Sequence, residues 1–354
     1  MGNAGRSVAI VGAGLAGLQC ARELRERGIP VRLFDKGRRV GGRVCTRRMD
    51  SGAEFDHGAQ YFTARGERFQ QLVAEWVSRG VVAEWTGRLV QLTAGRTGPE
   101  PAATTRYVGV PSMSAVPRDL ARGLPEVECG RVTALTRGAE GWSLEWEPGA
   151  GGGSEPAGGS RHEAGGFGAV VLALPAEQAT GLLAGAKGLA WGGVEGGLRE
   201  RVAGVSISPC WGVLLEFAGR LGVEFDGAFV GDSPLRWVAR NNSKPGRPGR
   251  ECWVLHAGPE WSREHLEASA EWVAGELEQA FWQALGVPGV GAVARQAHRW
   301  RYALPESPLA EQFVFAEEAG LGVCGDWCGG PRVEGAWTSG ARLGERVAGW
   351  WPGR

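Results

Sequence analysis

Three glycines with fixed spacing stand near the start of the chain, and an acidic residue follows them at a matching distance. Gly12, Gly14 and Gly17 form a GxGxxG motif, and Asp35 lies about 20 residues further on. In such a motif the first glycine permits a tight turn, the second lets a pyrophosphate approach the backbone, and the third allows a helix to pack closely on a strand. The acid accepts hydrogen bonds from a ribose. The pattern therefore predicts a dinucleotide site.

The residues around the motif predict the elements that must position it. Ser7 to Val11 is β-branched and apolar, Leu15 to Arg27 carries apolar residues at helical spacing, and Gly28 is a typical helix stop. Val31 to Phe34 predicts a second strand, closed by Asp35. This βαβ unit places the glycine loop at a helix N-terminus, where free amides stabilise phosphate oxygens. The fingerprint by itself does not separate NAD from FAD.

A second group of side chains predicts a substrate pocket. Residues 298 to 302 alternate with period two, so His298, Trp300 and Tyr302 share one strand face, which either stacks a flat ring or lines a core beneath a helix. Asn241 is one of only three asparagines in the chain. We expect it to share a cavity with His256 of a neighbouring strand. A lone histidine in an apolar strand is also typical of a satisfied core residue.

Further along the chain, several segments predict the scaffold. Arg65 to Arg79 and a segment that begins at a Ser262 cap carry helical apolar stripes, and residues 205 to 256 hold strand-like runs typical of an antiparallel sheet. Residues 148 to 168 are too poor in apolar side chains to pack, so we expect a flexible glycine-rich loop there. Strands are also expected at 169 to 174 and 320 to 326, and a last helix at 332 to 350.

Composition excludes several classes of function. The 354 residues include 39 Lys plus Arg and 39 Asp plus Glu, so the chain has no net positive charge that would attract nucleic acid or anionic lipid. No apolar run approaches the roughly 18 residues of a membrane span, so we expect no membrane association. Seven scattered cysteines show no spacing typical of a metal site, and they favour a reducing, cytoplasmic environment.

Longer strings resemble a known family. Asp35 followed by Gly41-Gly42-Arg43 resembles the flavin amine oxidase superfamily, whose members bind FAD. Residues 55 to 65, FDHGAQYFTAR, resemble the signature of its bacterial renalase-like branch. Counterparts of that branch also occur at 108–114, 232–241, 324–328 and 333–337, so the resemblance covers nearly the whole chain except the insert at 148 to 168.

The resemblance implies an α/β fold of two domains: a Rossmann-type FAD-binding domain and a substrate domain with a mixed antiparallel sheet plus helices. The expected FAD domain comprises residues 1–62, 107–175 and 319–354, and the substrate or cap domain comprises 63–106 and 176–318. Asp326, at the end of a strand, is expected near ribityl hydroxyls or the pyrophosphate. The helix that follows is expected to stabilise the negative charge of reduced flavin.

The expected cofactor-binding residues are Gly12, Gly14, Leu15, Ala16, Gly17, Asp35, Lys36, Gly42, Arg43, His57, Gly58, Ala59, Gln60, Val132, Gly325, Asp326, Arg332, Val333, Glu334 and Gly335. The expected catalytic residues are Gln60, Tyr61, Trp237, Asn241, His256, Trp300 and Tyr302. The implied reaction takes hydride from 2- or 6-dihydro isomers of NAD(P) to FAD and passes electrons to O2, giving NAD(P)⁺ and hydrogen peroxide.

Two other functions are compatible with the same fold. The first is amine oxidation, or another FAD-dependent step of specialised metabolism. Monoamine oxidases use a pair of tyrosines and a lysine near the flavin, whereas this chain has only three tyrosines and three lysines from which to build such a site. The other is a purely binding protein, since Rab GDP-dissociation inhibitors resemble the same fold without catalysing redox chemistry.

Overall fold

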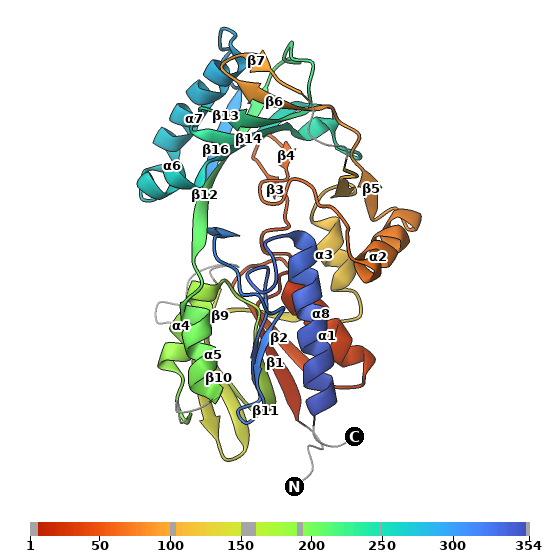
Figure 1. The fold of residues 1–354 in the computed structure, drawn as a ribbon, viewed down its shortest axis with the longest axis vertical. Helices are drawn as coiled ribbons and strands as arrows, with labels where there is room; N and C mark the ends of the chain where they lie inside the picture. Colours follow the sequence, from red (N-terminus) through yellow and green to blue (C-terminus); the bar gives the residue numbers. More distant parts are fainter. Residues whose placement is uncertain (1–5, 100–103, 150–160, 190–193, 248, 352–354) are drawn as a thin grey trace. The chain divides into compact units, whose positions relative to one another are not determined.

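The computed structural model describes residues 6–99, 104–149, 161–189, 194–247 and 249–351. The chain forms two compact units, drawn in Figure 1. Unit 1 comprises Met1–Gly42, Pro117–Ile207 and Pro305–Arg354, and unit 2 comprises Arg43–Val116 and Ser208–Leu304. The expected FAD domain instead ended its first segment at residue 62 and began its later segments at 107 and 319. Residues 43 to 62 pack with unit 2 because β3 and β4 of this segment lie against the strands of that unit.

Unit 1 is built on a seven-stranded sheet whose central strands are parallel. β1 (Ser7–Val11) lies between β2 (Val31–Asp35) and β11 (His162–Leu172), and β18 (Leu321–Val323) extends the parallel set. β1 and β18 are almost continuously buried, as parallel strands covered on both faces are. The remaining strands are β9 (Val127–Gly138), β10 (Gly141–Pro148) and β17 (Val314–Ala316).

Helices α1 (Leu15–Glu26) and α8 (Val333–Trp350) lie side by side in unit 1 (Figure 1). Gly340 of α8 approaches Ala16 of α1 so closely that a Cβ at position 340 would overlap the Ala16 carbonyl group. The small residue therefore lets the first turn of α1 pack on α8. The other helices of this unit are α4 (Ala176–Gly185) and α5 (Val194–Ala203), and α3 (Ala115–Leu120) crosses the boundary between the units.

The second unit contains a seven-stranded sheet in the order β16-β12-β15-β14-β13-β6-β7. Its strands are β12 (Ile207–Phe217), β13 (Gly227–Gly231), β14 (Leu235–Arg240), β15 (Glu251–Ala257), β16 (Ala294–Pro305), β6 (Leu89–Thr93) and β7 (Arg96–Thr97). Trp253 and Leu255 point to one face and pack with Phe281 of α7 (Ala270–Leu285). Val254 points to the other face and packs with Phe55. The second face is therefore covered by the segment that carries the predicted signature.

Shorter elements complete unit 2. They are β3 (Arg47–Arg48), β4 (Glu54–Phe55), α2 (Glu67–Ser78), β5 (Val82–Glu84), β8 (Tyr107–Gly109), the 3-10 turn η1 (Asn241–Ser243) and α6 (Pro259–Glu264). β5 and β8 pair with each other outside the large sheet.

Two expectations about these elements were wrong. Ser262 does not cap the long helix; it lies inside α6, where its Oγ accepts from Trp211 N (3.1 Å), and Ser269 caps α7 by accepting from Trp272 N. The glycine-rich loop is shorter than expected, because β11 begins at His162 and pairs with β10. Backbone pairing needs no apolar side chain, which explains why this polar segment still forms a strand. The flexibility predicted for residues 150–160 lies outside the described residues.

Most of the other expected elements are confirmed. α1, α2 and α8 and the strands at 7–11, 31–35 and 321–323 lie within one or two residues of the expected bounds or inside them. The expected fold class, α/β with a Rossmann-type unit and a mixed antiparallel sheet unit with helices, is the architecture observed.

Candidate functional site

The glycine loop of unit 1 is held by its own backbone and by Asp35. The Asp35 carboxylate accepts from Ala13 N (2.6 Å) with one oxygen and from Gly37 N (2.7 Å) with the other. Gly12 has φ +111°, a backbone conformation that strongly favours glycine, and a Cβ at Gly17 would overlap the Gly12 carbonyl group. The first and third glycines are therefore required by the protein's own packing, as the motif predicts.

Gly14 differs from its two neighbours in the motif. A Cβ at this position would meet nothing within 4 Å, and the φ of −74° is open to any residue. No side chain of the described residues caps α1, whose N-cap residue is Gly14 itself. Uncapped amides at a helix N-terminus favour negative charge. An open space above a glycine that the fold does not need fits the approach of a pyrophosphate, so this loop fits a dinucleotide.

The C-terminal part of unit 1 supplies the second expected cofactor segment. Gly325 N donates to Ser339 Oγ (2.9 Å), which fixes the turn between β18 and α8, and Asp326 is 8% exposed. A Cβ at Gly335 would overlap the Gly330 carbonyl group. No side chain caps α8, whose N-cap residue is Arg332. The dipole of this uncapped helix end favours negative charge, as expected for residues 332 to 335.

The remaining expected cofactor residues are divided between the two units. Lys36 and Gly42 follow the loop in unit 1, and Val132 is buried in β9. Arg43 and residues 57 to 60 belong to unit 2. There, Ala59 N donates to the Arg43 carbonyl oxygen (2.9 Å), and Arg43 Nη1 donates to the Ala303 carbonyl oxygen (2.8 Å).

Two histidines and a tryptophan of unit 2 gather around His57. The carbonyl oxygen of His57 accepts from His256 Nε2 (3.1 Å) and from Trp300 Nε1 (3.0 Å). Its ring lies 4.9 Å from the ring of His298 and 5.0 Å from that of Trp300. His298 also accepts from Arg47 Nη1 (3.1 Å). The predicted residues His256 and Trp300 are thus brought together by a backbone carbonyl of the signature segment.

These histidines are held uncharged. Burial, together with the nearby His298, Arg47 and His256, lowers the pKa of His57 to about 3, although Asp56 opposes the shift. Burial lowers the pKa of His256 to about 4, aided by Lys244, and burial with Arg47 lowers the pKa of His298 to about 4. We call His57, His256, His298 and Trp300 the histidine cluster. It presents neutral rings, which neither attract nor repel a charged ring strongly.

Asp56 anchors a second buried group in unit 2. Its Oδ2 faces two cations, Arg247 Nη2 (2.5 Å) and Lys244 Nζ (3.4 Å), and all three side chains are at most 2% exposed. Lys244 Nζ also donates to Gln60 Oε1 (3.0 Å) and Asn241 Oδ1 (3.3 Å). The two cations hold the pKa of Asp56 below its usual range, although burial opposes them, and burial lowers the pKa of Lys244 to about 8. One carboxylate faces two cations here, so the Asp56 group carries an excess positive charge.

The amides of Asn241 and Gln60 are used within this group. Asn241 Nδ2 donates to the Glu54 carbonyl oxygen (2.8 Å), and Asn241 Oδ1 accepts from Asp56 N (3.2 Å). Gln60 Nε2 donates to the carbonyl oxygens of Asp56 and Gly58. Both residues therefore position the 54 to 60 segment. Asn241 lies one residue past β14 rather than within it, so its direction is set by η1 and not by strand alternation.

The expected aromatic residues do not form a single group. The Tyr61 and Trp237 rings lie 5.6 Å apart, and Trp237 stands opposite His256 in the β14–β15 pair. Alternation along β16 is confirmed for His298 and Trp300, whose rings lie 4.4 Å apart, while Arg299 and Arg301 both pair with Glu267. Tyr302 is half-buried on the same strand.

Several residues of this region were not singled out from the sequence. Lys244, Arg247 and Trp85 belong to segments without a recognised chemical motif, and Asp56 lay inside the signature without a separate role. A signal existed for Lys244, because lysine is as rare in this chain as asparagine. The same reasoning from rarity that selected Asn241 applies to this lysine.

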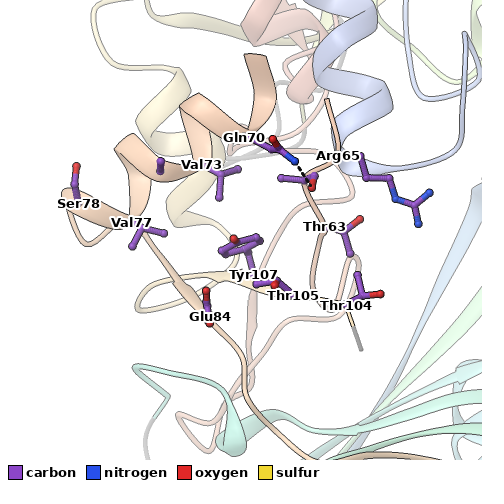
Figure 2. Close-up of a pocket in the computed structure, with 12 residues that line it drawn as sticks. Thr63, Arg65, Gln70, Val73, Val77, Ser78, Glu84, Thr104, Thr105 and Tyr107 are labelled. Atoms are coloured by element: carbon purple, nitrogen blue, oxygen red, sulfur yellow. Dashed lines mark hydrogen bonds between the residues drawn. The ribbon is translucent and has the colours of Figure 1, made fainter. Parts of the chain in front are cut away.

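A pocket of about 590 Å³ lies between α2 and the β5–β8 pair (Figure 2). Thr63, Glu84 and Tyr107 line it, and Gln70 Nε2 donates to the Ala64 carbonyl oxygen at its edge (3.4 Å). None of the predicted site residues lines this pocket. Among the described residues, no group of three or more His, Cys, Asp or Glu side chains is placed to hold a metal ion. No described helix is long and apolar enough to cross a bilayer.

Comparison with known proteins begins with the N-terminal segment. Residues 10–76 match a family model described as an NAD(P)-binding Rossmann-like domain. Protoporphyrinogen oxidase 2 of Arabidopsis thaliana is 42% identical over 59 residues, which are 17% of this chain and 11% of the relative. FLOWERING LOCUS D of the same plant is 45% identical over 60 residues, 16% of this chain and 8% of the relative. The chain thus spans about a tenth of the length of these curated relatives.

Solved structures match over nearly the whole chain. Cyclohexylamine oxidase from Brevibacterium oxydans IH-35A superposes with a TM-score of 0.70 at 11% identity, covering 97% of this chain and 99% of that one. Wild-type putrescine oxidase bound to putrescine gives 0.64 at 14% identity, with 97% and 98% covered. These similarities confirm the expected fold, with one Rossmann-type unit and one unit of a mixed antiparallel sheet with helices.

Proposed function

We propose that this protein is an FAD-dependent oxidase of the renalase type, which oxidises 2- or 6-dihydro isomers of NAD(P). The observation that carries the cofactor assignment is the open space above Gly14 at an uncapped helix N-terminus, in a fold that cyclohexylamine oxidase shares over 97% of this chain. The uncapped start of α8 and the buried Asp326 support a second contact region for the cofactor in unit 1. Bound FAD would accept a hydride from the substrate and pass two electrons to O2.

The proposed reaction balances without a further reagent. A dihydronicotinamide gives up one hydride and becomes NAD(P)⁺, and O2 takes up that hydride's two electrons with two protons and becomes hydrogen peroxide. One proton comes with the hydride and the other from solvent. No residue of the chain has to act as a strong acid or base, which suits a site whose histidines are held neutral.

The residues of unit 2 support a flat, uncharged reacting ring. The histidine cluster supplies neutral aromatic faces, ordered by the two hydrogen bonds to the His57 carbonyl oxygen. The Asp56 group places an excess positive charge in the same unit, which favours an electron-rich ligand. The signature at residues 55 to 65 supports the renalase type in particular, since it carries Asp56, His57 and Gln60.

The tyrosines and lysines favour this proposal over amine oxidation. Tyr61 packs on Trp85 and Trp237, and Tyr107 packs on Phe62. Lys244 is fully buried with Asp56, and the other two lysines, Lys36 and Lys187, belong to unit 1. All seven cysteines are free thiols, which supports the accompanying proposal of a cytoplasmic location.

The test is anaerobic mixing of the purified protein with separated 2-, 4- and 6-dihydro isomers of NAD(P), with the flavin absorbance followed by stopped flow. We expect fast bleaching with the 2- or 6-isomer, none with the 4-isomer, and return of the colour with peroxide formation when air is admitted. A yellow protein that dithionite reduces but no isomer bleaches would overturn the proposal in favour of amines or biosynthetic intermediates. A colourless protein that binds no FAD would indicate a binding protein.

A further inference from the structure

Three aromatic side chains of unit 2 form a group that neither the histidine cluster nor the Asp56 group includes. The ring of Tyr61 lies 5.6 Å from that of Trp237 and 6.1 Å from that of Trp85, and the two indoles lie 6.4 Å apart. Phe229 packs edge-on against Trp237 at 4.7 Å. We call Tyr61, Trp85 and Trp237 the Tyr61 group. Tyr61 is half-buried, whereas both indoles are almost fully buried.

Two hydrogen-bond donors beside this group have no acceptor in the part of the chain that the structure describes. Trp237 is 7% exposed, and its Nε1 has no partner among the described residues. The Nε of Arg106 is also buried and unpartnered there, and the guanidinium of Arg106 lies over the Tyr61 ring at 5.4 Å. By contrast, Trp85 Nε1 donates to Ser243 Oγ (3.1 Å). Buried donors are normally paired, so two unpaired donors against one ring indicate a ligand that brings an acceptor.

The charges around the Tyr61 group exclude one class of ligand. Aromatic faces attract cations, but here Arg106 already lies over Tyr61, and Lys244 Nζ lies 5.7 Å from the ring of Trp85. Asp56 balances only one of the two cations Lys244 and Arg247. A further ammonium group would meet like charge at both rings. The group therefore differs from an aromatic cage that binds an amine.

Strands β5 and β8, which Trp85 and Arg106 extend, separate the Tyr61 group from the pocket of Figure 2. Trp85 N donates to the Arg106 carbonyl oxygen (2.8 Å), so these two residues extend the β5–β8 pair. Glu84 and Tyr107, their neighbours in the chain, line the pocket of Figure 2. Successive side chains of a strand point to opposite faces. The β5–β8 pair thus presents the Glu84 carboxylate to the pocket and the Arg106 guanidinium to the ring of Tyr61.

We propose that the Tyr61 group is the specificity subsite for a planar carbonyl group on an uncharged or anionic ring, with Trp237 and Arg106 as its donors, and that it discriminates against cationic rings and amines. This inference rests on the proposed function, because the carboxamide of a dihydronicotinamide is such a group. It also goes further: oxidation turns the neutral ring into a pyridinium cation, which the same charges repel. The subsite therefore favours substrate over product.

The test uses equilibrium binding to the FAD-loaded protein under anaerobic conditions, followed by calorimetry and by the shift of the flavin spectrum. The probes are nicotinamide, nicotinate, 1-methylnicotinamide and benzylamine. Nicotinamide and 1-methylnicotinamide share the carboxamide and differ by a methyl group and its positive charge. We expect nicotinamide and nicotinate to bind at least about tenfold more tightly than the two cations, because a cationic probe would meet the like charges of Arg106 and Lys244.

Variants assign the donors. Trp237→Phe keeps the ring and removes the unpartnered N–H, so we expect a roughly five- to tenfold loss of nicotinamide affinity with unchanged FAD content and melting temperature. Trp85→Phe is the matched control, because Ser243 already accepts its N–H, and we expect no comparable loss. Arg106→Gln removes a cation, so we expect it to reduce the difference in affinity between nicotinamide and 1-methylnicotinamide.

Three results would overturn the subsite. They are equal affinity for the neutral and cationic probes, tighter binding of benzylamine, and unchanged nicotinamide affinity in Trp237→Phe. The outcome is separable from that of the proposed function. If no dihydro isomer bleaches the flavin but nicotinamide binds through Trp237, the redox proposal fails and the subsite stands. If the isomers bleach the flavin equally in Trp237→Phe and wild type, the redox proposal stands and the subsite fails.

Discussion

The glycine loop of unit 1 and the Asp56 group of unit 2 both organise a carboxylate, and they do so in opposite ways. Asp35 is half-buried and, among the described residues, accepts from two backbone amides close to it in the chain, Ala13 N and Gly37 N. Asp56 is fully buried and pairs with Lys244 and Arg247, which lie 188 and 191 residues further along the chain. The first arrangement shapes a loop for a ligand, and the second holds distant segments together.

This difference shows in which part of the protein a substitution can change ligand binding without changing stability. In the glycine loop, Gly12 and Gly17 serve the fold while Gly14 leaves space unused by the protein, so binding can be removed without unfolding. In the Asp56 group the same side chains anchor the signature segment and set the local charge. A change there alters stability and the site together.

The largest expected effect is at Asp56. Asp56→Ala leaves Lys244 and Arg247 buried without a carboxylate, so we expect a loss of roughly 3–5 kcal/mol in the free energy of unfolding. Asp35→Ala removes only hydrogen bonds of a half-buried carboxylate, and we expect about 1–3 kcal/mol together with weaker FAD retention. Urea unfolding of both variants measures this. Equal losses at the two positions would contradict the comparison.

The next effect separates fold from binding within the glycine loop. Gly17→Ala forces a Cβ into the Gly12 carbonyl group, so we expect a loss of about 1–3 kcal/mol in stability. Gly14→Val meets open space and suits the extended backbone, so its unfolding free energy should stay within about 0.5 kcal/mol of wild type. We expect the same variant to lose at least about tenfold in FAD affinity, because the valine occupies the pyrophosphate space. Absorbance of the retained flavin gives this readout. Full FAD content in Gly14→Val would show that the open space is not the cofactor site.

The smallest effect concerns the histidine cluster and pH. The pKa of His57 is about 3 and that of His256 about 4 in the folded protein, whereas the unfolded chain binds protons below about pH 6.5. The unfolded state then holds more protons, so stability falls as pH falls. From pH 6.5 to 5.5 we expect a loss of about 1 kcal/mol for each of these two histidines. Denaturant unfolding at the two pH values checks this.

A matched pair of variants tests the assignment to His256. His256→Gln should reduce the loss of stability between pH 6.5 and 5.5, whereas His162→Gln, at an exposed position of β11, should leave it unchanged. The opposite ranking, or stability that rises as the solution becomes more acidic, would show that the buried histidines are not held neutral.

The sequence by itself determined the glycine loop, Asp35 and the elements around them. These features depend on backbone conformation and on contacts within about 40 residues, which spacing and periodicity express directly. It also determined the alternation that places His298 and Trp300 on one face of β16. It failed at Ser262 and at the start of β11, because Pro259 begins a separate short helix and because backbone pairing continues through a glycine-rich segment.

Only the tertiary structure decided the partners in unit 2. Asn241 was identified by its rarity, but its amide turned out to hold Glu54 and Asp56. Asp56 pairs with Lys244, and Trp237 packs beside Tyr61, although the partners are far apart in the chain. The same packing leaves the indole N–H of Trp237 without a partner among the described residues. No local pattern encodes such contacts, because which long-range strands pair and which side chains are buried depends on the packing of the whole sheet.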